Sequence, residues 1–196
     1  PDRGVRQRLY PRTSRAGWSR FAVPHAWNVG DHSVASFNGS VGWYRKDFEL
    51  PDKRAALEWA VRFESVNYRT RVYLNGREIG RNAGAYIPFT MRLKGLRKRG
   101  VNRLVVRADL RRLPTHFPPS GLSTTGNATG RWFNYGGIQR EVYLQKLDTV
   151  QFNTVRVLPR LPCASCPATV DFTLALENVT NTGRSISAVA KFGSKR

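Results

Sequence analysis

Short apolar runs separated by turn residues repeat along almost the whole chain. Each run has the length of a strand, and most alternate apolar with polar positions, as a strand with one buried face does. Gly, Pro or Asn stands between successive runs, which is typical of a sandwich or barrel and not of alternating strands and helices. The pattern therefore predicts an all-β fold. The predicted strands are Trp43–Leu50, Leu57–Val66, Thr70–Leu74, Pro88–Leu93, Arg103–Ala108, Glu141–Gln145, Thr154–Leu158, Thr169–Leu176 and Ile186–Phe192.

The strongest local signal is the hairpin that Asn75-Gly76 predicts. Apolar Val72 and Leu74 precede this pair, and Ile79 follows it. Both central residues of a type I′ turn need positive φ, which Asn and Gly tolerate best. We therefore expect the pair to form a structural turn.

Two stretches, Ser14–Gly42 and Leu113–Arg131, lack a strand pattern and are predicted to be loops. The second is rich in Pro, Gly, Ser and Thr. Loops of this length inside a compact domain are uncommon, and they tend to carry function or to move. The segment before Ser14 is basic and has no pattern, so the first domain is interpreted as lacking its opening strand.

The rhythm of the sequence changes after Asp148-Thr149, which is predicted to be a domain junction. Beyond it, Phe172, Leu174 and Leu176 alternate regularly with polar residues. The residues that remain are too few for a complete immunoglobulin-like sandwich of about 100 residues. The chain is therefore interpreted as a fragment with an incomplete second domain.

The chain is strongly basic, with 33 Lys and Arg residues against 13 Asp and Glu residues and a formal net charge of +20. Such a charge attracts anions, and nucleic acid is the usual first candidate. Most basic residues, however, are scattered through alternating strands, and only Leu93–Arg103 and Arg111-Arg112 form dense clusters. A solvated β surface accounts for this distribution, so no specific nucleic-acid partner is predicted.

Cys163 and Cys166 form a lone C-x-x-C between prolines. A zinc site needs two further ligands, and the sequence offers no second pair. A redox motif would open a helix of a thioredoxin-like unit, which the pattern does not predict. A local disulfide in a secreted protein is open, and a structural or incidental role is favoured. No metal and no organic cofactor is predicted.

Membrane and targeting signals are weak throughout the sequence. No apolar run approaches the roughly 20 residues that a membrane helix needs, and the N-terminal segment lacks the apolar core of a signal peptide. No membrane partner is predicted. The compartment stays open between the bacterial cytoplasm and secretion.

Several segments carry a family resemblance when they are taken in order. They are V-P-H-A-W-N (Val23–Asn28), G-W-Y-R-K-D-F-E-L-P (Gly42–Pro51), the long run Val61–Gly80, A-Y-I-P-F (Ala85–Phe89), N-R-L-V-V-R (Asn102–Arg107) and W-F-N-Y-G-G-I-Q-R-E-V-Y-L (Trp132–Leu144). Together they resemble the N-terminal sugar-binding domain of glycoside hydrolase family 2, the family of β-galactosidases and β-glucuronidases. The set is specific because order and spacing also match, over residues 17–147.

The resemblance implies a fold and a partner. Residues 1–147 are expected to form a jelly-roll (galactose-binding-like) β-sandwich, and residues 148–196 a truncated immunoglobulin-like β-sandwich. Full-length members continue into a (β/α)₈ barrel that carries both catalytic glutamates. The implied function is therefore the non-catalytic N-terminal region of an enzyme that hydrolyses β-linked sugars, with a carbohydrate as substrate and the barrel as partner.

No catalytic residue is predicted within this chain. Retaining glycoside hydrolysis needs two carboxyl groups about 5–5.5 Å apart, one as nucleophile and one as acid/base. The acidic residues stand mostly on strands whose alternation points them outward, such as Glu49, Glu58, Glu78 and Glu141. The fragment alone is expected to be inactive as a hydrolase.

The candidate substrate-binding residues follow the second loop and are Arg131, Trp132, Asn134 and Tyr135. Aromatic faces stack on the C–H surface of a pyranose, and amide or hydroxyl groups pair with its hydroxyls. The alternative is that these aromatic residues, with Phe133, fill the core. In family members that reach the active site, an Asp stands where Arg131 stands here. A guanidinium cannot accept a hydrogen bond from a sugar hydroxyl, although it suits an acidic sugar.

Two rival functions stay open at this stage. One is a free-standing carbohydrate-binding module, which would bind oligosaccharides without a catalytic domain. The less favoured one is a polyanion- or nucleic-acid-binding domain that combines basic and stacking side chains.

Overall fold

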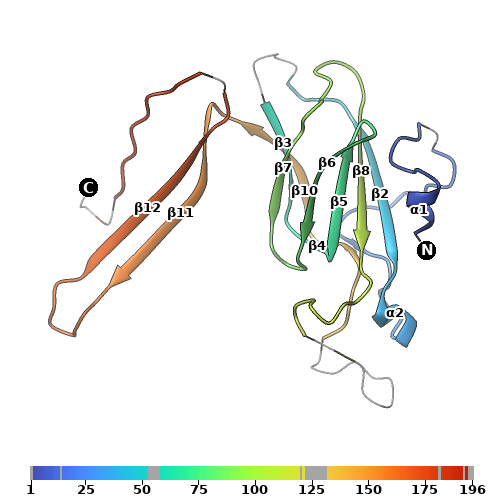
Figure 1. The fold of residues 1–196 in the computed structure, drawn as a ribbon, viewed down its shortest axis with the longest axis horizontal. Helices are drawn as coiled ribbons and strands as arrows, with labels where there is room; N and C mark the ends of the chain where they lie inside the picture. The colour runs from blue at the N-terminus through green and yellow to red at the C-terminus, as the bar shows by residue number, and fades with distance from the viewer. Residues whose placement is uncertain are drawn as a thin grey trace. The chain divides into compact units, whose positions relative to one another are not determined.

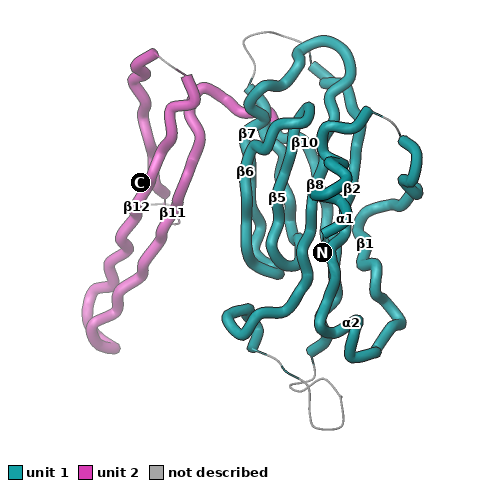
Figure 2. The backbone as a smooth tube through the Cα atoms, turned by 45° about the vertical axis from the view of Figure 1, so that its right-hand side comes forward, with its two compact units in different colours: residues 1–145 teal, residues 146–196 magenta. Residues whose placement is uncertain are grey.

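The computed structural model describes residues 2–13, 15–52, 58–119, 121, 132–180, 182–191 and 193. The chain divides into two compact units, residues 1–145 and 146–196, which are described one at a time (Figure 2). Both are built mainly from antiparallel strands (Figure 1), so the prediction of a β fold is confirmed. Within the described residues, no helix is long and apolar enough to cross a membrane.

The first unit contains a four-stranded antiparallel sheet in the order β2-β8-β5-β6 (Figure 1). Its strands are β2 (Val41–Phe48), β8 (Asn102–Asp109), β5 (Arg69–Leu74) and β6 (Arg77–Ala83). Because alternate residues of a strand point to opposite faces, β8 and β5 each send one apolar row into the core and a row with two arginines to the outer face.

The turn between β5 and β6 forms as the sequence predicts. Asn75 has φ 51° and Gly76 has φ 87°, the positive values that a type I′ turn needs. The Asn75 amide also donates to Asn102 Oδ1 at 3.0 Å, and Asn75 Oδ1 accepts from the backbone of Arg103 at 2.9 Å. The turn residue therefore fixes the hairpin to the neighbouring strand β8.

A second layer of strands packs across the core from this sheet. It consists of β3 (Glu58–Phe63) between β10 (Val142–Leu147) and β7 (Phe89–Arg92). A third, very small sheet joins two-residue strands in the order β1-β9-β4. These are β1 (His25–Ala26), β9 (Gly137–Ile138) and β4 (Val66–Asn67).

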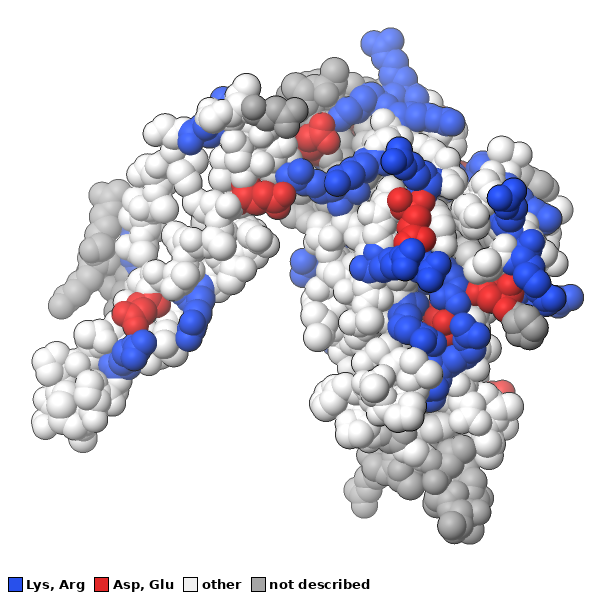
Figure 3. Space-filling model, in the orientation of Figure 1, with Lys and Arg blue, Asp and Glu red and all other residues white. Residues whose placement is uncertain are grey.

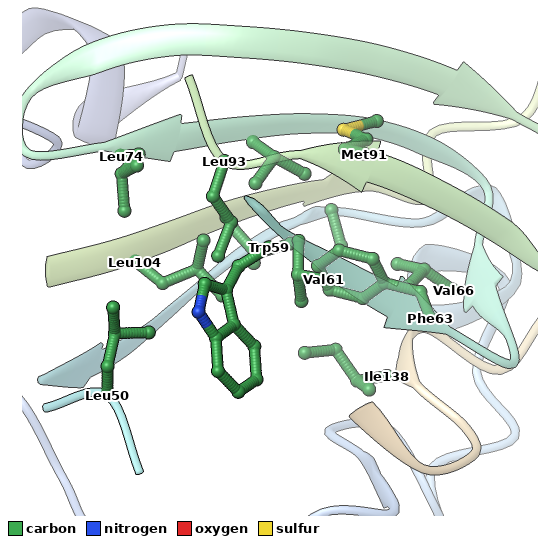
Figure 4. Packing of buried hydrophobic residues seen from close by; sticks show 13 residues of the cluster. Leu50, Trp59, Val61, Phe63, Val66, Leu74, Met91, Leu93, Leu104 and Ile138 are labelled. Carbon is green, nitrogen blue, oxygen red and sulfur yellow. The ribbon is translucent and has the colours of Figure 1, made fainter. Parts of the chain in front are cut away.

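The core lies between the two layers, and both contribute to it (Figure 4). Phe63 and Val61 of β3 meet Val72 of β5, and each is at most 1% exposed. Complete burial of such a side chain contributes about 1.5–3 kcal/mol. The remaining buried members of the cluster are Leu50, Trp59, Val66, Leu74, Met91, Leu93, Leu104, Val106, Ala108 and Ile138.

Two one-turn helices lie in segments that the sequence predicts as patternless. Helix α1 (Arg3–Arg6) is capped by the Asp2 carboxylate, and α2 (Val34–Asn38) by the Ser33 hydroxyl. A side-chain oxygen at the N-cap satisfies an amide that the helix leaves unpaired. A single helical turn is too short to produce a detectable period, so the sequence pattern did not reveal either helix.

Three guanidinium groups surround each of two carboxylates on the outer face of the four-stranded sheet. Asp47 pairs with Arg45, Arg103 and Arg15 at 2.7, 2.9 and 3.1 Å. Asp109 pairs with Arg111, Arg107 and Arg69 at 2.7, 2.9 and 3.1 Å. Figure 3 shows acidic side chains lying among the basic ones over this unit. The scattered arginines therefore form compact ion clusters.

These clusters predict acid sensitivity. Hydrogen bonds from Arg45, Arg103 and Arg15 hold the pKa of Asp47 well below its ordinary value, against an opposing effect of burial. A carboxyl with a lowered folded pKa stabilises the protein above its unfolded pKa of about 4, and this stability is lost as the pH falls below that value. We expect the melting temperature to drop between pH 5 and pH 2, and to drop less in Asp47→Asn. Identical pH profiles in differential scanning fluorimetry would contradict this account.

The second unit consists of one long antiparallel hairpin, β11 (Val150–Arg160) with β12 (Thr169–Asn178). A bulge at Asn153 keeps Phe152 on the same face as Val155 and Val157. Their cross-strand partners on this face are Leu176, Leu174 and Phe172. The hairpin is therefore apolar on one face and polar on the other.

The strand predicted at Ile186–Phe192 is wrong for the residues described there, since 182–191 form no strand. Ile186 and Val189 nevertheless line a groove of about 510 Å³ beside the apolar face of the hairpin. Both side chains are about half exposed and stand three positions apart, so the alternation predicted for this segment is not observed.

Cys163 and Cys166 form a disulfide in the loop between β11 and β12. Both residues lie in a surface loop, so a reductant and an alkylating agent reach them without unfolding of the protein. We expect no alkylation of the native chain, and two alkylated cysteines after mild reduction without denaturant, measured by mass spectrometry. Labelling that requires denaturant, or labelling before reduction, would contradict this structure.

Candidate functional site

The candidate site lies at one end of the first unit, where Trp132 meets residues from distant parts of the chain. The indole Nε1 donates to the Tyr86 hydroxyl at 2.6 Å. The guanidinium carbon of Arg112 lies 4.9 Å from the centre of the indole ring, a cation–π distance. The Phe37 ring, from α2, lies nearly perpendicular to the same indole, with the ring centres 6.5 Å apart. Trp132 therefore stays half-buried, with its orientation fixed by three contacts.

Asn134 is fully buried, and its hydrogen-bond partners are other groups of the protein. Its amide donates to the carbonyl oxygens of Phe37 at 2.8 Å and Leu110 at 3.0 Å. Its own backbone carbonyl accepts from the Asn28 amide at 2.9 Å. These bonds tie α2 and the end of β8 to the segment before β9. Whether Asn134 also contributes to substrate binding stays a prediction.

The rings of Phe133 and Tyr135 lie in a chain of aromatic contacts. The Phe133 ring lies nearly perpendicular to the rings of Phe37 and His32, with ring centres 5.6 and 5.2 Å apart. Tyr135 lies 5.2 Å from Phe133, and its carbonyl oxygen accepts from the amide groups of Asn67 and Gln139, each at 2.6 Å. Both rings are half-buried. They therefore pack beneath the segment that follows the loop and still expose part of their surface to solvent.

Arg131 lies outside the described residues, as do residues 122–130 of the predicted loop. The substitution of Asp by Arg at that position therefore stays a sequence-based prediction. The structure adds Tyr86 and Arg112, which the sequence did not assign to a site. No sequence signal brings Tyr86 to Trp132, because 46 positions separate them.

His116 and Tyr68 stack at 3.9 Å behind this surface, and the Tyr68 hydroxyl accepts from the backbone of Phe117 at 3.0 Å. Burial lowers the pKa of His116, and the charges of Arg69 and Arg112 lower it further. The histidine is therefore neutral at pH 7 and serves as a packing group for the loop.

The chemistry that these side chains offer is recognition of a flat polar ligand. Tyr86 is 50% exposed beside the indole of Trp132, and Phe117 is 73% exposed on a neighbouring loop. Aromatic faces of this kind stack on sugar rings, and the Tyr86 hydroxyl can exchange hydrogen bonds with sugar hydroxyls. Among the described residues, no group of His, Cys, Asp or Glu is suited to hold a metal ion.

Comparison with known protein families assigns the chain that carries this surface to a family. The profile described as "Glycosyl hydrolases family 2, sugar binding domain" matches residues 20–148, which include Trp132, Asn134 and Tyr135. The chain belongs to glycosyl hydrolase family 2. The resemblance expected from the ordered segments is therefore confirmed.

Relatives in family 2 are much longer than this chain. A putative β-glucuronidase of Formosa agariphila is 27% identical over 176 residues, which are 88% of this chain and 20% of the relative. The β-galactosidase BoGH2A of Bacteroides ovatus is 29% identical over 74% of this chain and 16% of its own length. The chain thus spans about a fifth of these family 2 proteins.

Solved structures show the same fold. A β-glucuronidase from an uncultured Clostridium species superposes with a TM-score of 0.69 at 22% identity, covering 88% of this chain and 30% of that structure. The β-glucuronidase of Ruminococcus gnavus gives a TM-score of 0.67 at 23% identity over 89% of this chain. The arrangement of strands described above is therefore that of family 2 N-terminal regions.

Proposed function

We propose that this chain is the non-catalytic N-terminal sugar-binding region of a family 2 glycoside hydrolase that cleaves β-linked sugars. The observation that carries the proposal is the match of the sugar-binding profile to residues 20–148. The names of the relatives, β-glucuronidase and β-galactosidase, indicate the class of substrate. Their greater length leaves room for a separate catalytic domain.

The ion pairs described above support a non-catalytic role. Asp47 and Asp109 each lie among three guanidinium groups that lower the carboxyl pKa. For Asp109, burial raises the carboxyl pKa, but the hydrogen bonds from Arg111 and Arg107 and the charges of Arg107 and Arg69 together outweigh it and lower the pKa. A general acid in glycoside hydrolysis needs a raised pKa, so these carboxylates are unsuited to the task.

The finer architecture of the proposal is a jelly-roll over residues 1–147 and an incomplete immunoglobulin-like sandwich over residues 148–196. Two antiparallel layers enclose the core of the first unit, as the sheets of a jelly-roll do. The hairpin β11–β12 has an apolar face that an immunoglobulin-like sandwich would cover with its opposite sheet.

In this proposal, Trp132 and Tyr86 shape one rim of the substrate pocket of the complete enzyme. The indole and phenol rings offer a stacking surface, and Arg112 adds a positive charge beside them. Asn134 and Tyr135 act from behind, by fixing the loop that presents Trp132. Arg131 precedes this surface and is proposed to favour an acidic sugar.

Hydrolysis of p-nitrophenyl β-glucuronide and β-galactoside tests the proposal. We expect no turnover by the 196-residue chain and turnover by the longer polypeptide that contains it. In that polypeptide, Trp132→Ala should raise KM by about tenfold, the loss of one stacking contact of about 1.4 kcal/mol. Tyr143→Ala, an exposed residue on β10, is the matched control. Turnover by the short chain, or an equal effect of both variants, would refute the proposal.

Titration distinguishes the proposed function from its rival, a free-standing carbohydrate-binding module. A module would bind neutral oligosaccharides with saturation in the 196-residue form. The proposed rim gives measurable affinity when the catalytic domain completes the pocket. Isothermal titration of both forms with the same oligosaccharide decides between them.

A further inference from the structure

The outer face of the four-stranded sheet carries a buried apolar stripe that lies outside the core. Val105 of β8 points to this face, opposite the core residues Leu104 and Val106, yet it is 0% exposed. Its cross-strand partner on β5 is Tyr73, which is 5% exposed. Something must therefore cover the face. Figure 2 shows that α1 lies over β2 and β8 at this position.

The cover is the N-terminal segment, residues 2–13. Asp2 Oδ1 accepts from the indole Nε1 of Trp43 at 3.2 Å, and Asp2 Oδ2 accepts from Nε of Arg107. The Tyr10 ring lies parallel to Tyr73, with the ring centres 4.5 Å apart and the planes 17° apart. The segment thus places one carboxylate and one flat ring on the sheet.

The receiving surface is an aromatic platform with a guanidinium at its edge. Trp43 and Tyr73 stack with ring centres 6.1 Å apart and planes 22° apart. Trp43 and Arg107 are direct cross-strand partners on β2 and β8. A flat ring on Tyr73 and a carboxylate between Trp43 and Arg107 are therefore held side by side.

The positive charges around Arg107 favour an anion at the position of the Asp2 carboxylate. Three guanidinium groups, of Arg69, Arg107 and Arg111, share the single carboxylate of Asp109. The Arg107 side chain is 9% exposed and that of Asp109 is 4% exposed. Asp2 supplies the second negative charge. Without Asp2, the three guanidinium groups keep one carboxylate partner, and this excess of two positive charges favours another anion.

The segment is held on the sheet by a few side-chain contacts, both aromatic and polar. None of residues 2–13 and 15–24 belongs to a strand, so the sheet gives them no ladder of hydrogen bonds. Apart from the contacts of Asp2 and Tyr10, the carbonyl oxygens of Arg12 and Thr13 accept from Arg103 and Arg45 at 3.0 Å each. Such a segment can leave without disrupting the strands beneath it.

We infer that this outer face is a binding site for a carboxylated sugar, and that residues 2–13 compete for it. A uronate combines the two groups that the segment now supplies, a carboxylate and a ring with a flat C–H face. The carboxylate would take the place of Asp2 between Trp43 and Arg107, and the ring would take the place of Tyr10 on Tyr73. The site is separate from the Trp132 surface, and it does not depend on the proposed function.

Nucleic acid fits this face less well than a sugar acid. Asp47, Asp109 and Glu78 stand on the same face as the arginines. Their negative charges repel the regular phosphates of a nucleic-acid strand, which needs a continuous basic groove. A single carboxylate beside a stacked ring avoids them.

Competition predicts a gain of affinity when the segment is weakened. The apparent dissociation constant equals the intrinsic constant divided by the fraction of molecules with the face uncovered. The test is a titration of the 196-residue chain with tetragalacturonate. Binding is measured by the change in Trp fluorescence and by calorimetry. We expect the double variant Asp2→Asn, Tyr10→Ala to bind about tenfold more tightly than the wild type, although it is less stable.

Three further titrations and a competition with oligo(dT) complete the experiment. Adding Arg107→Gln to the double variant should abolish the gain, and Tyr143→Ala, at an exposed position on β10, should leave binding unchanged. A neutral tetrasaccharide of galactose should bind at least tenfold more weakly than tetragalacturonate, because it lacks carboxylates. The inference is overturned if the double variant binds no more tightly, if the neutral sugar binds equally well, or if oligo(dT) competes with equal strength. None of these results bears on the hydrolysis assay.

Discussion

Asn134→Ala is expected to lower the free energy of unfolding of the first unit by about 3 kcal/mol. The side chain is 0% exposed and donates to the carbonyl oxygens of Phe37 and Leu110. Alanine would leave both carbonyls buried without these donors, and each orphaned group costs about 1–3 kcal/mol. It would also leave a small void where the amide stood. Because folded domains are stable by only about 5–15 kcal/mol, urea denaturation should show this loss readily.

Asn38→Ala is the matched control for this experiment. Asn38 is exposed at the C-terminal end of α2, at the same end of the unit. Exposed substitutions away from special features usually change stability by less than about 0.5 kcal/mol. A loss of similar size in both variants would mean that the buried bonds of Asn134 are not the cause.

Periodicity predicted the strands well where one face of a strand is buried and the other is not. β5 and β8 alternate core residues such as Val72 and Val106 with arginines, and their predicted ranges agree with the structure to within one residue at each end. The two-residue strands β1, β4 and β9 escaped prediction, because two residues cannot establish a period. They form only when distant segments meet.

The segment 186–191 shows the converse case. Its apolar residues predicted a strand, and two of them, Ile186 and Val189, line a groove beside the apolar face of the hairpin β11–β12. Both side chains are about half exposed, and a strand exists only where its backbone hydrogen bonds are satisfied. The hydrophobic pattern therefore indicated residues near that face and failed to reveal the secondary structure.

The candidate site was predicted in part, because residue type indicates chemistry and not position. Trp132 stands out in the sequence as an aromatic residue after a long loop, but its partners Tyr86 and Arg112 come from separate loops. The basic surface was interpreted as scattered charge. In the structure, the same arginines gather around Asp47 and Asp109, since cross-strand neighbours that lie far apart in sequence become adjacent.

Gly137→Ala is expected to cost more than about 3 kcal/mol of stability or to prevent folding of the first unit. Gly137 has φ 140°, a conformation that residues with a Cβ rarely adopt. A Cβ at this position would also overlap the carbonyl oxygen of His25 on the adjoining strand β1. Since β9 lies between β1 and β4, relief of this overlap must separate the strands on at least one side. Backbone strain from the positive φ and steric overlap of the added Cβ therefore both destabilise the variant.

Gly183→Ala provides the contrast, because a Cβ there meets nothing within 4 Å and no positive φ is involved. If close packing at Gly137 is what orders the small sheet, the two variants must differ in urea denaturation by the full expected amount. The same ordering holds the segment from Trp132 to Gly136 in place, since Trp27 donates its backbone amide to the Gly136 carbonyl at 3.0 Å. Gly137→Ala should then also change the fluorescence of Trp132. This contribution is obtained by subtracting the spectrum of the same protein carrying Trp132→Ala, with and without Gly137→Ala. A stable Gly137→Ala protein with unchanged fluorescence would show that β9 does not position the site.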